Sequence, residues 1–458
     1  MPKNDALFFD AVLKGNMTQA KWFADRGADP RKPSGAHTPL RAATLNGHVH
    51  MVKWLVDDLK VSPKEDNRAL HLVALSQSPS QELFLYLVDR GASPTAEDEK
   101  LGSPLTLALQ QGHEDFARWL VEKYQLRVDE QGTSLEKTTP LHKACHSCTP
   151  KMIDFLMERG ALSTLHTLDA QRHSPLMVAV EEKKTENAEH LLSKYKADPN
   201  QLADTSALFI AAQDGYVPTM KVLLRHGANP SIWHPEMQVT PLHIAASNDH
   251  IFVVRELLAH GAAVDAVSGK GFTPLIMACS QGYVDSTRAL LEAGANVNYI
   301  SPHDGATALH HAVTGGFVPC ARLLLSFKPD LTIQDKGQMT AAVCVEAMLE
   351  EKPGDASLLL LKNLFATLDV DERGKCTRCF KALDAPKRCG KCKAVFYCSA
   401  ECQAADWKAG HAKVRTAAVC SPFLCLCSFF FFLCNRSVLQ WSLQKRLMQN
   451  EGFIWQRD

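Results

Sequence analysis

Residues 240–246 read Thr-Pro-Leu-His-Ile-Ala-Ala, and versions of this stretch return along the chain every 30 to 36 residues. Clear copies begin at Thr38, Ser103, Thr139, Ser174, Thr273 and Thr307, and weaker copies begin at Arg68, Ser206 and Thr340. A period of this length is typical of proteins built from stacked units, in which each unit buries its apolar face against its neighbours. The sequence therefore predicts an all-α repeat fold.

Each repeat is predicted to form two short helices. Thr or Ser can cap the first helix, and the Pro that follows has a backbone angle suited to the first helical turn. Glycine is expected where a helix ends, because a left-handed residue commonly closes a helix. Such residues follow the first helix at Gly47, Gly112, Gly215, Gly282 and Gly316, with Asp249 in the same place, and the second helix at Gly27, Gly91, Gly160, Gly227, Gly261 and Gly294.

About eleven repeats fit between residues 1 and 370, and the outermost ones are degenerate, as the ends of a stack are expected to be. The first begins near Ala6 and Leu7, and the apolar stretch 356–368 is predicted to form a closing helix. The copies at 67–100 and 339–366 match weakly, which leaves their local packing open. The polar stretch 369–374 is predicted to be a short linker.

The motif, its period and its glycines resemble the ankyrin repeat over residues 4–370. The resemblance implies an elongated, curved solenoid whose hairpin loops and first helices line a concave surface that binds protein partners. In that family the motif histidine hydrogen-bonds to neighbouring loops, which implies a packing role for His142, His243 and His310. The alternative for one predicted helix is a metal site at His142, Cys145, His146 and Cys148.

Trp233, His234 and Met237 lie in a predicted loop between repeats. An aromatic side chain beside polar groups can anchor a protein partner, and packing against the next repeat is the alternative. No nucleophile with a base, phosphate-binding loop or pair of carboxylates indicates catalysis. We therefore expect neither an enzyme nor a small-molecule substrate.

A second pattern occupies 36 consecutive residues and consists of Cys376, Cys379, Cys389, Cys392, Cys398, Cys402 and His411. Zinc takes four ligands from Cys sulfur and His nitrogen, and two cysteines separated by two residues can reach one ion. Seven ligands are too many for one closed site and one too few for two. Spacing alone leaves the pairing of the ligands open.

This pattern, with Tyr397, Gln403 and Trp407 in order, resembles the MYND-type zinc finger over residues 376–415. The resemblance implies that a first zinc is bound by Cys376, Cys379, Cys398 and Cys402, and a second by Cys389, Cys392 and His411. Some members of the family bind proline-rich peptides. That activity implies a peptide site at Gln403, Trp407, Phe396 and Tyr397, and packing of Trp407 around the metal is the alternative.

The last ligand of the family pattern is expected at position 415, where this chain has Arg415. Cys420 could substitute for it, water could fill the position, or the second site could be empty and partly unfolded. A zinc with three protein ligands and a water also has the coordination of a catalytic site, but the sequence of this segment indicates neither a general base nor a pocket. We predict one tightly bound zinc and a second that is weak or absent.

From residue 416 the sequence departs from the finger pattern, and we predict a disordered or aberrant tail over 416–458. Residues 417–434 are uncharged and largely apolar, a length at the lower limit for a membrane helix. Pro422, four cysteines and the polar extension of 24 residues argue against a membrane anchor. A replaced C-terminal exon or a gene-model error is the alternative explanation, and we expect no membrane binding unless 417–434 acts as a tail anchor.

Composition limits the partners. Lys and Arg number 50, as do Asp and Glu, so no overall field attracts nucleic acid or anionic lipid. The basic first half of the finger is better explained as a solvated face than as a nucleic-acid site. The metal-type cysteine spacing and the lack of a leader pattern predict an intracellular protein, cytoplasmic, nuclear or both.

The leading interpretation is a non-enzymatic scaffold or adaptor whose solenoid and finger bind separate proteins. The alternative is a transcriptional or chromatin co-regulator whose finger docks a proline-rich corepressor peptide.

Overall fold

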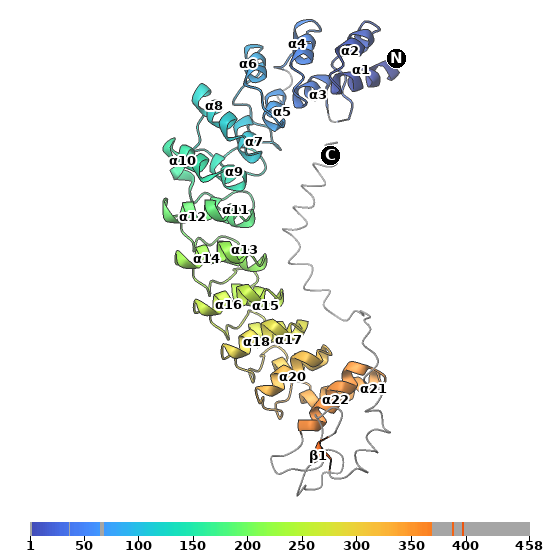
Figure 1. The fold of residues 1–458 in the computed structure, drawn as a ribbon, viewed down its shortest axis with the longest axis vertical. Helices are drawn as coiled ribbons and strands as arrows, with labels where there is room; N and C mark the ends of the chain where they lie inside the picture. The colour runs from blue at the N-terminus through green and yellow to red at the C-terminus, as the bar shows by residue number, and fades with distance from the viewer. Residues whose placement is uncertain (1, 36, 65–67, 369–386, 389–395, 398–458) are drawn as a thin grey trace. The chain divides into compact units, whose positions relative to one another are not determined.

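A computed structural model describes residues 2–35, 37–64 and 68–368, together with the backbone of two short strands. The described residues contain 22 α-helices, one 3-10 helix and two strands (Figure 1). They fall into two compact units, one ending at Ala197 and one beginning at Asp198. The predicted all-α repeat fold is confirmed.

The first unit holds six helix pairs. Their bounds are α1 (Pro2–Leu13) and α2 (Met17–Ala24), α3 (Pro39–Leu45) and α4 (Val49–Asp57), α5 (Ala69–Leu75) and α6 (Gln81–Asp89), α7 (Pro104–Gln110) and α8 (Glu114–Tyr124), α9 (Pro140–Ser147) and α10 (Pro150–Glu158), and α11 (Pro175–Glu181) and α12 (Thr185–Ser193). The 3-10 helix (Ala161–Thr164) follows α10.

The second unit holds five helix pairs and the strands. Its helices are α13 (Ala207–Gln213) and α14 (Val217–Arg225), α15 (Pro241–Ser247) and α16 (Ile251–Ala259), α17 (Pro274–Gln281) and α18 (Val284–Glu292), α19 (Ala308–Thr314) and α20 (Val318–Ser326), and α21 (Ala341–Glu351) and α22 (Ala356–Leu368). The strands β1 (Lys387–Arg388) and β2 (Phe396–Tyr397) pair antiparallel.

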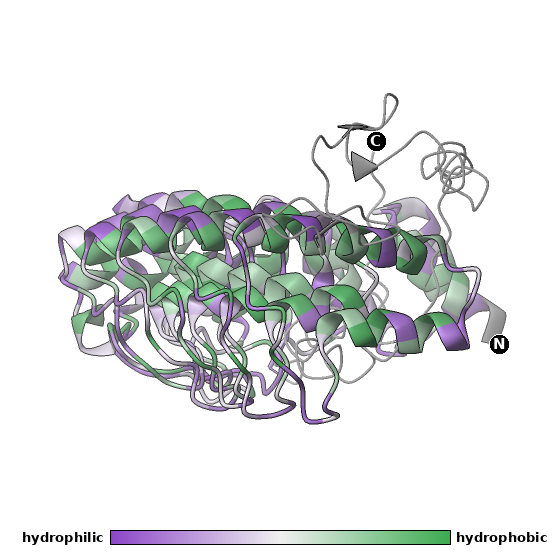
Figure 2. Cartoon of the chain, turned by 90° about the horizontal axis from the view of Figure 1, so that it is seen from below, coloured by the Kyte–Doolittle hydropathy of each residue, from purple (hydrophilic) through white to green (hydrophobic). Residues whose placement is uncertain are grey.

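Within each unit the first helices of successive pairs pack against one another. In the second unit α13, α15, α17, α19 and α21 form such a row, and α14, α16, α18, α20 and α22 form a second layer over it. Figure 2 shows the two layers of helices, with the long loops that lead into the first helices gathered along one edge. We call these long loops the hairpin loops.

The predicted helix boundaries have a visible physical basis. The hydroxyl of Thr273 accepts a hydrogen bond from the backbone N–H of Ile276, and Ser206 does the same for Phe209. These bonds satisfy amide groups that the start of a helix leaves unpaired. The motif leucines attach the first helices to the core, since none of these side chains is more than 3% exposed. Burial of each one contributes about 2 kcal/mol of hydrophobic free energy.

The predicted helix-ending glycines all have left-handed backbone angles, and so does Asp249 (φ 57°). Five further helix ends with a residue other than glycine were missed, because left-handed angles of 50° to 58° also occur at Lys60, Gln125, Lys183, Lys196 and Lys328. Lysine carries no signal for this conformation, which glycine adopts at the lowest cost. The closing helix predicted at 356–368 is confirmed as α22, the second helix of the last pair.

Candidate interaction surface and zinc finger

The motif histidines link each repeat to the next hairpin loop. Nδ1 of His243 accepts a hydrogen bond from the backbone N–H of Thr240 (3.1 Å), and Nε2 donates to the carbonyl oxygen of Phe272 (3.0 Å). His142 makes the equivalent bonds to Thr139 and to the carbonyl of His173. The predicted packing role is therefore confirmed, and it requires the neutral imidazole with the proton on Nε2.

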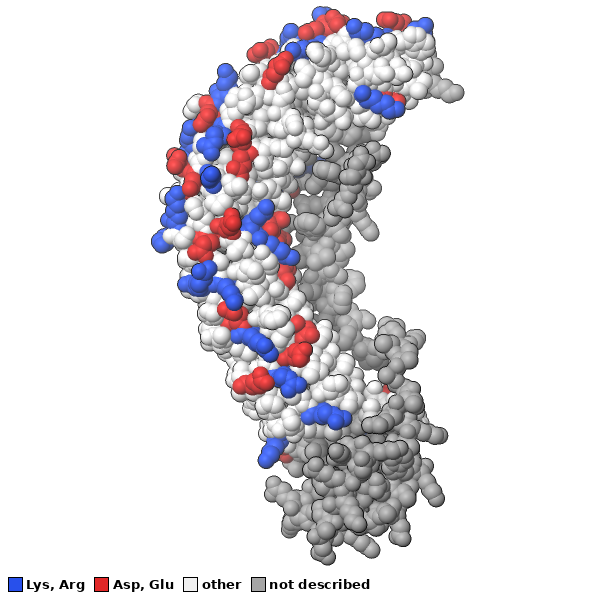
Figure 3. Space-filling view, in the orientation of Figure 1, with Lys and Arg blue, Asp and Glu red and all other residues white. Residues whose placement is uncertain are grey.

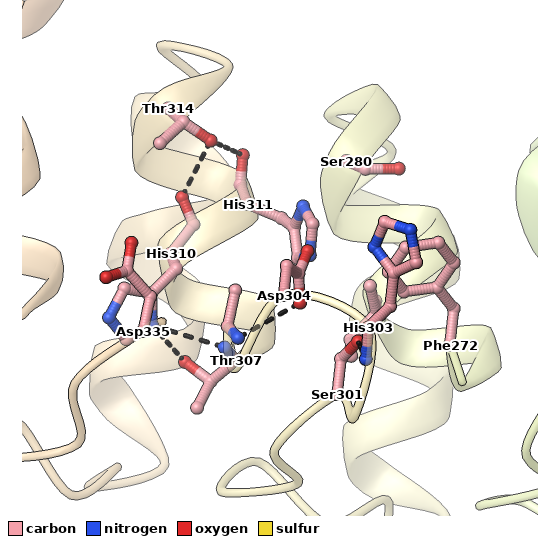
Figure 4. A network of polar contacts seen from close by, with 12 residues as sticks. Phe272, Ser280, Ser301, His303, Asp304, Thr307, His310, His311, Thr314 and Asp335 are labelled. Atoms are coloured by element: carbon pink, nitrogen blue, oxygen red, sulfur yellow. Dashed lines mark hydrogen bonds and ion pairs between the residues drawn. The ribbon is translucent and has the colours of Figure 1, made fainter. Parts of the chain in front are cut away.

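The same arrangement recurs at the end of the second unit. His310 accepts from the N–H of Thr307 (3.2 Å) and donates to the carbonyl of Met339 (3.2 Å). Figure 4 shows the contact between His310 and Thr307 beside the neighbouring His311, whose Nε2 lies 3.2 Å from a carboxylate oxygen of Asp304. These polar side chains hold the hairpin loops against the first helices.

Burial lowers the pKa of the motif histidines. Loss of solvation lowers the pKa of His142 to about 4 and that of His243 to about 4, although their hydrogen bonds to carbonyl groups oppose the shift. Both imidazoles are therefore neutral at physiological pH. A neutral imidazole can keep accepting at Nδ1, whereas a protonated one cannot.

The cysteines near His142 serve the core. Cys145 is fully buried, and the thiol of Cys148 donates to the carbonyl of Leu109 (3.2 Å). Burial raises the pKa of Cys148 to about 12, so its thiol stays protonated. His146 lies 3.2 Å from a carboxylate oxygen of Glu182. Across the described ranges, no group of three or more His, Cys, Asp or Glu residues has the geometry to hold a metal ion.

Four exposed apolar side chains occupy the same position in successive hairpin loops of the second unit. Each lies six residues after the left-handed residue that follows a second helix, namely Lys196, Gly227, Gly261 and Gly294. The four side chains, which we call the apolar row, are Leu202 (48% exposed), Trp233 (45%), Val267 (38%) and Ile300 (50%). Large apolar side chains lined up on adjacent loops form a surface suited to another protein.

The loops that carry the apolar row are hydrogen-bonded to one another. Two residues before each member stands a side chain whose oxygen accepts from a backbone N–H of the next repeat. The four bonds run from Asn229 N to Asn200 (2.7 Å), Ala263 N to Ser231 (3.0 Å), Asn296 N to Asp265 (2.9 Å) and Asp330 N to Asn298 (2.8 Å). The apolar row is therefore held in register before any partner arrives, which lowers the entropy cost of binding.

The first unit is different at the equivalent positions. Six residues after Gly91, Gln125 and Gly160 stand Glu97, Gln131 and His166. Polar residues occupy these three positions, so an apolar side chain is not a general requirement of the repeat. The apolar row is a particular feature of the second unit.

In the loop at 233–237, the observed packing is against the preceding helix α13 and not against the next repeat, and partner binding by Trp233 stays a prediction. Trp233 is exposed, whereas the ring of His234 packs on Phe209 with centroids 4.6 Å apart. The N–H of Met237 donates to Nδ1 of His234. The sequence analysis missed Leu202, Val267 and Ile300, although counting six residues from each helix end would have found them.

Charged side chains are mixed on the described surface. On the face drawn in Figure 3, Lys and Arg alternate with Asp and Glu, and neither sign forms a continuous patch over the described residues. Both signs also lie near the apolar row. Asp204 and Glu236 are exposed beside Leu202 and Trp233. Lys270 is exposed near Val267, and Asp265 and Asp304 lie beside Val267 and Ile300.

The predicted zinc ligands lie outside the described residues, as do Gln403, Trp407 and Cys420, and of the peptide candidates only the backbone of Phe396 and Tyr397 is described. Around them, β1 pairs with β2 so that Arg388 stands opposite Phe396 and Lys387 opposite Tyr397. Cys389 and Cys392 belong to the connection between these paired strands, and Cys398 directly follows β2. Two cysteines separated by two residues, in the segment between paired strands, fit zinc ligation, since such a pair can reach one ion.

With this geometry in place, comparison with known families identifies the class. The family model described as ankyrin repeats (3 copies) matches six overlapping stretches, 8–98, 76–167, 105–203, 176–268, 208–301 and 262–335. The chain therefore belongs to the ankyrin-repeat proteins. The MYND finger model matches residues 376–414, so the chain also carries a zinc-binding module of that type.

Individual relatives match only in part. The B-cell lymphoma 3 protein homolog of Mus musculus is 28% identical over 54% of this chain and 55% of its own length. The human transient receptor potential cation channel subfamily A member 1 is 25% identical over 64% of this chain and 20% of its own. The N-lysine methyltransferase SMYD2 of Gallus gallus is 44% identical over 12% of this chain, in the finger region, and 13% of its own.

The chain spans about half the length of the two B-cell lymphoma 3 proteins it matches and 17% of alpha-latrocrustotoxin-Lt1a. Among the described residues, no helix is both long enough and apolar enough to cross a membrane. The tail-anchor alternative at 417–434 falls outside the described residues.

Proposed function

We propose that this protein is a non-enzymatic adaptor that binds one protein through the apolar row of its second unit and another through its zinc finger. The proposed binding of the first protein rests on the apolar row itself. Its members are exposed, aligned on adjacent loops and held by hydrogen bonds between those loops, and the equivalent positions 97, 131 and 166 of the first unit are polar. A few residues dominate the energy of a protein interface, and tryptophan, here Trp233, is enriched among them.

The second half rests on the finger. The proposed first zinc site is Cys376, Cys379, Cys398 and Cys402, and the incomplete second site is Cys389, Cys392 and His411, with Cys420 as a substitute ligand. The metal would stabilise a fold too small to have a core of its own. An intracellular location is part of this proposal, and the co-regulator alternative with its corepressor peptide stays a prediction.

The test is comparative affinity capture with the full chain. We expect the variant Leu202→Ser/Trp233→Ser/Val267→Ser/Ile300→Ser to lose a set of proteins that the wild type retains. The matched control is Phe252→Ser on α16, which removes an exposed aromatic (71% exposed) away from the apolar row and should lose none of them. Capture of the same proteins by wild type and row variant would contradict the proposal.

A further inference from the structure

We infer that the zinc finger, residues 376–414, docks on the end of the repeat stack that α21 and α22 form (Figure 1). Two exposed apolar side chains mark this end surface, Val343 on α21 (44% exposed) and Leu359 on α22 (40% exposed). Each stands at a position through which earlier repeats touch the repeat that follows them. The docking goes beyond the proposed function, because it concerns how the two modules of the chain are joined and not which proteins they bind.

Val343 occupies the position that the next hairpin loop covers in earlier repeats. It lies three residues after the residue that caps its helix, as the motif histidines do. The equivalent side chains in the second unit are all buried, namely Phe209, His243, Ile276 and His310. The next loop supplies their contacts, since the ring of Phe209 packs on His234 and His310 donates to the carbonyl of Met339. Val343 is apolar and has no following hairpin loop among the described residues.

Leu359 occupies the position through which a second helix contacts the next second helix. It lies two residues before Leu361, a buried leucine that matches Leu55, Leu120, Leu156 and Leu223 of earlier repeats. Two residues before those leucines stand Lys53, Arg118, Asp154 and Lys221. Each of these four side chains contacts the residue that precedes the buried leucine of the next second helix.

The four contacts show what this position does in the stack. Nζ of Lys53 lies 5.7 Å from the ring centroid of Tyr86, the guanidinium of Arg118 lies 4.2 Å from that of Phe155, Asp154 accepts from His190 (2.6 Å), and Lys221 pairs with Glu256 (3.5 Å). All four side chains are charged, whereas α22 has a leucine. A leucine at a contact position suits an apolar neighbour, because covering it removes apolar surface from water.

The two positions lie on different layers of the last helix pair, so a body that covers both must span the end of the pair. Packed helices such as α21 and α22 lie about 8–10 Å apart, which is wider than a single extended segment covers. The finger has a suitable size, since 376–414 spans 39 residues and one repeat takes 30 to 36. Its sequence also contains four aromatic residues that can supply apolar contacts, Phe380, Phe396, Tyr397 and Trp407.

The connection keeps the finger close to this surface. α22 ends at Leu368 and the finger begins at Cys376, so seven residues join them. Seven extended residues reach about 25 Å, whereas Leu359 lies about 14 Å back along α22, so the finger can reach it. A tether of this length gives an effective concentration in the millimolar range, roughly, which a second copy or a separate protein must exceed.

The experiment measures hydrogen exchange by mass spectrometry in α21 and α22 of the full chain, loaded with zinc as checked by native mass spectrometry and then treated with a chelator. We expect chelation to speed exchange in these two helices by about tenfold, because loss of the metal unfolds the finger and uncovers the end of the stack. The helices α15 and α17, which lie inside the stack, should not respond. Unchanged exchange in α21 and α22 after chelation would overturn the inference.

The matched variants separate docking from other effects of zinc. In Val343→Ser/Leu359→Ser, exchange in α21 and α22 should be fast from the start, and chelation should add nothing. Phe252→Ser on α16 removes an exposed aromatic far from the end of the stack and should respond to chelation as the wild type does. Equal acceleration by chelation in the wild type and the double variant would overturn the inference.

Two further measurements test other occupants of the same surface. Phe430→Asp/Phe432→Asp in the tail should leave the exchange of α21 and α22 unchanged, and faster exchange would assign the surface to residues 416–458 instead. Sedimentation velocity should show a monomer, and a dimer that Val343→Ser/Leu359→Ser abolishes would assign the surface to a second copy. Either result would overturn the inference and leave the proposed function standing, because capture through the apolar row does not involve these two residues.

Discussion

Nε2 of His243 lies 3.0 Å from the carbonyl oxygen of Phe272, 29 residues later in the next hairpin loop. The same histidine caps its own helix through Thr240. One neutral side chain thus joins the start of a helix, the following loop and the core between them. Because the imidazole is buried and must stay neutral, the stability of the stack depends on pH.

We predict that the repeats lose stability as the pH falls from about 6.5 to about 4. The folded pKa of His243 is about 4 whereas an exposed histidine has a pKa near 6.5, so below 6.5 the unfolded chain binds the proton first. Each such histidine accounts for a loss of roughly 3 kcal/mol when the pH reaches the folded pKa. Urea unfolding followed by circular dichroism at pH 7.5 and 5 measures the loss.

The control for this pH effect is His243→Gln. It should cost about 1–3 kcal/mol at pH 7.5, because the buried bonds to Thr240 and Phe272 are disturbed, and it should flatten the pH dependence. A wild-type protein whose stability is the same at pH 7.5 and pH 5 would contradict the burial argument.

The loop-to-loop bond from Asn296 to Asp265 gives a local prediction. Asp265→Ala should speed hydrogen exchange at the amide of Asn296 about tenfold, because that amide loses a charge-assisted bond worth roughly 1.5 kcal/mol. Asp285→Ala on α18 removes an exposed carboxylate elsewhere in the same unit and should leave Asn296 unchanged. Identical exchange in all three proteins would mean that the bond does not hold the loop.

Asp154 on α10 accepts hydrogen bonds from three side chains of the next repeat. One of its oxygens accepts from His190 (2.6 Å), Lys194 (2.7 Å) and Tyr195 (2.5 Å). Burial would raise the pKa of Asp154, but these bonds lower it to about 2. Asp154→Asn should therefore reduce the free energy of unfolding at pH 7 by roughly 1–3 kcal/mol, as measured in urea.

The pH dependence of that loss has a definite sign. Because the pKa of Asp154 is lower in the folded protein, its ionised carboxylate stabilises the fold above about pH 3.8. That stability is lost as the pH falls towards 2, so Asp154→Asn should reduce the free energy of unfolding least in acid. Asp129→Asn is the matched control, because its ion pair with Arg127 is exposed and contributes little to stability. Equal effects of the two substitutions would refute the central role of Asp154.

The finger yields a prediction about metal content. Native mass spectrometry should find one tightly held zinc per chain, since Arg415 stands where the second site expects its last ligand. Arg415→Cys should raise the zinc content towards two, and Cys376→Ser should abolish tight binding, because each tetrahedral site needs four ligands. Two tightly held ions in the wild type would disprove this account.

A large part of the fold could be read from local sequence. The Thr-Pro start, the motif leucine and the closing glycines determine helix boundaries through hydrogen bonds and backbone angles within a few residues, and the structure has them where they were expected. Lys183 and Lys328 escaped prediction because lysine, unlike glycine, has no preference for a left-handed backbone angle that could be read from the sequence.

The sequence by itself determined that this chain is a stack of helix pairs followed by a cysteine-rich finger, because helix caps, repeat period and ligand spacing are local properties. Only the tertiary structure decided which residues face outward together. Each of Leu202, Trp233, Val267 and Ile300 is more than 30 residues from the next, and their alignment comes from hydrogen bonds between neighbouring loops. Whether a side chain is exposed depends on the repeats on either side of it, so the sequence of a single repeat does not determine it.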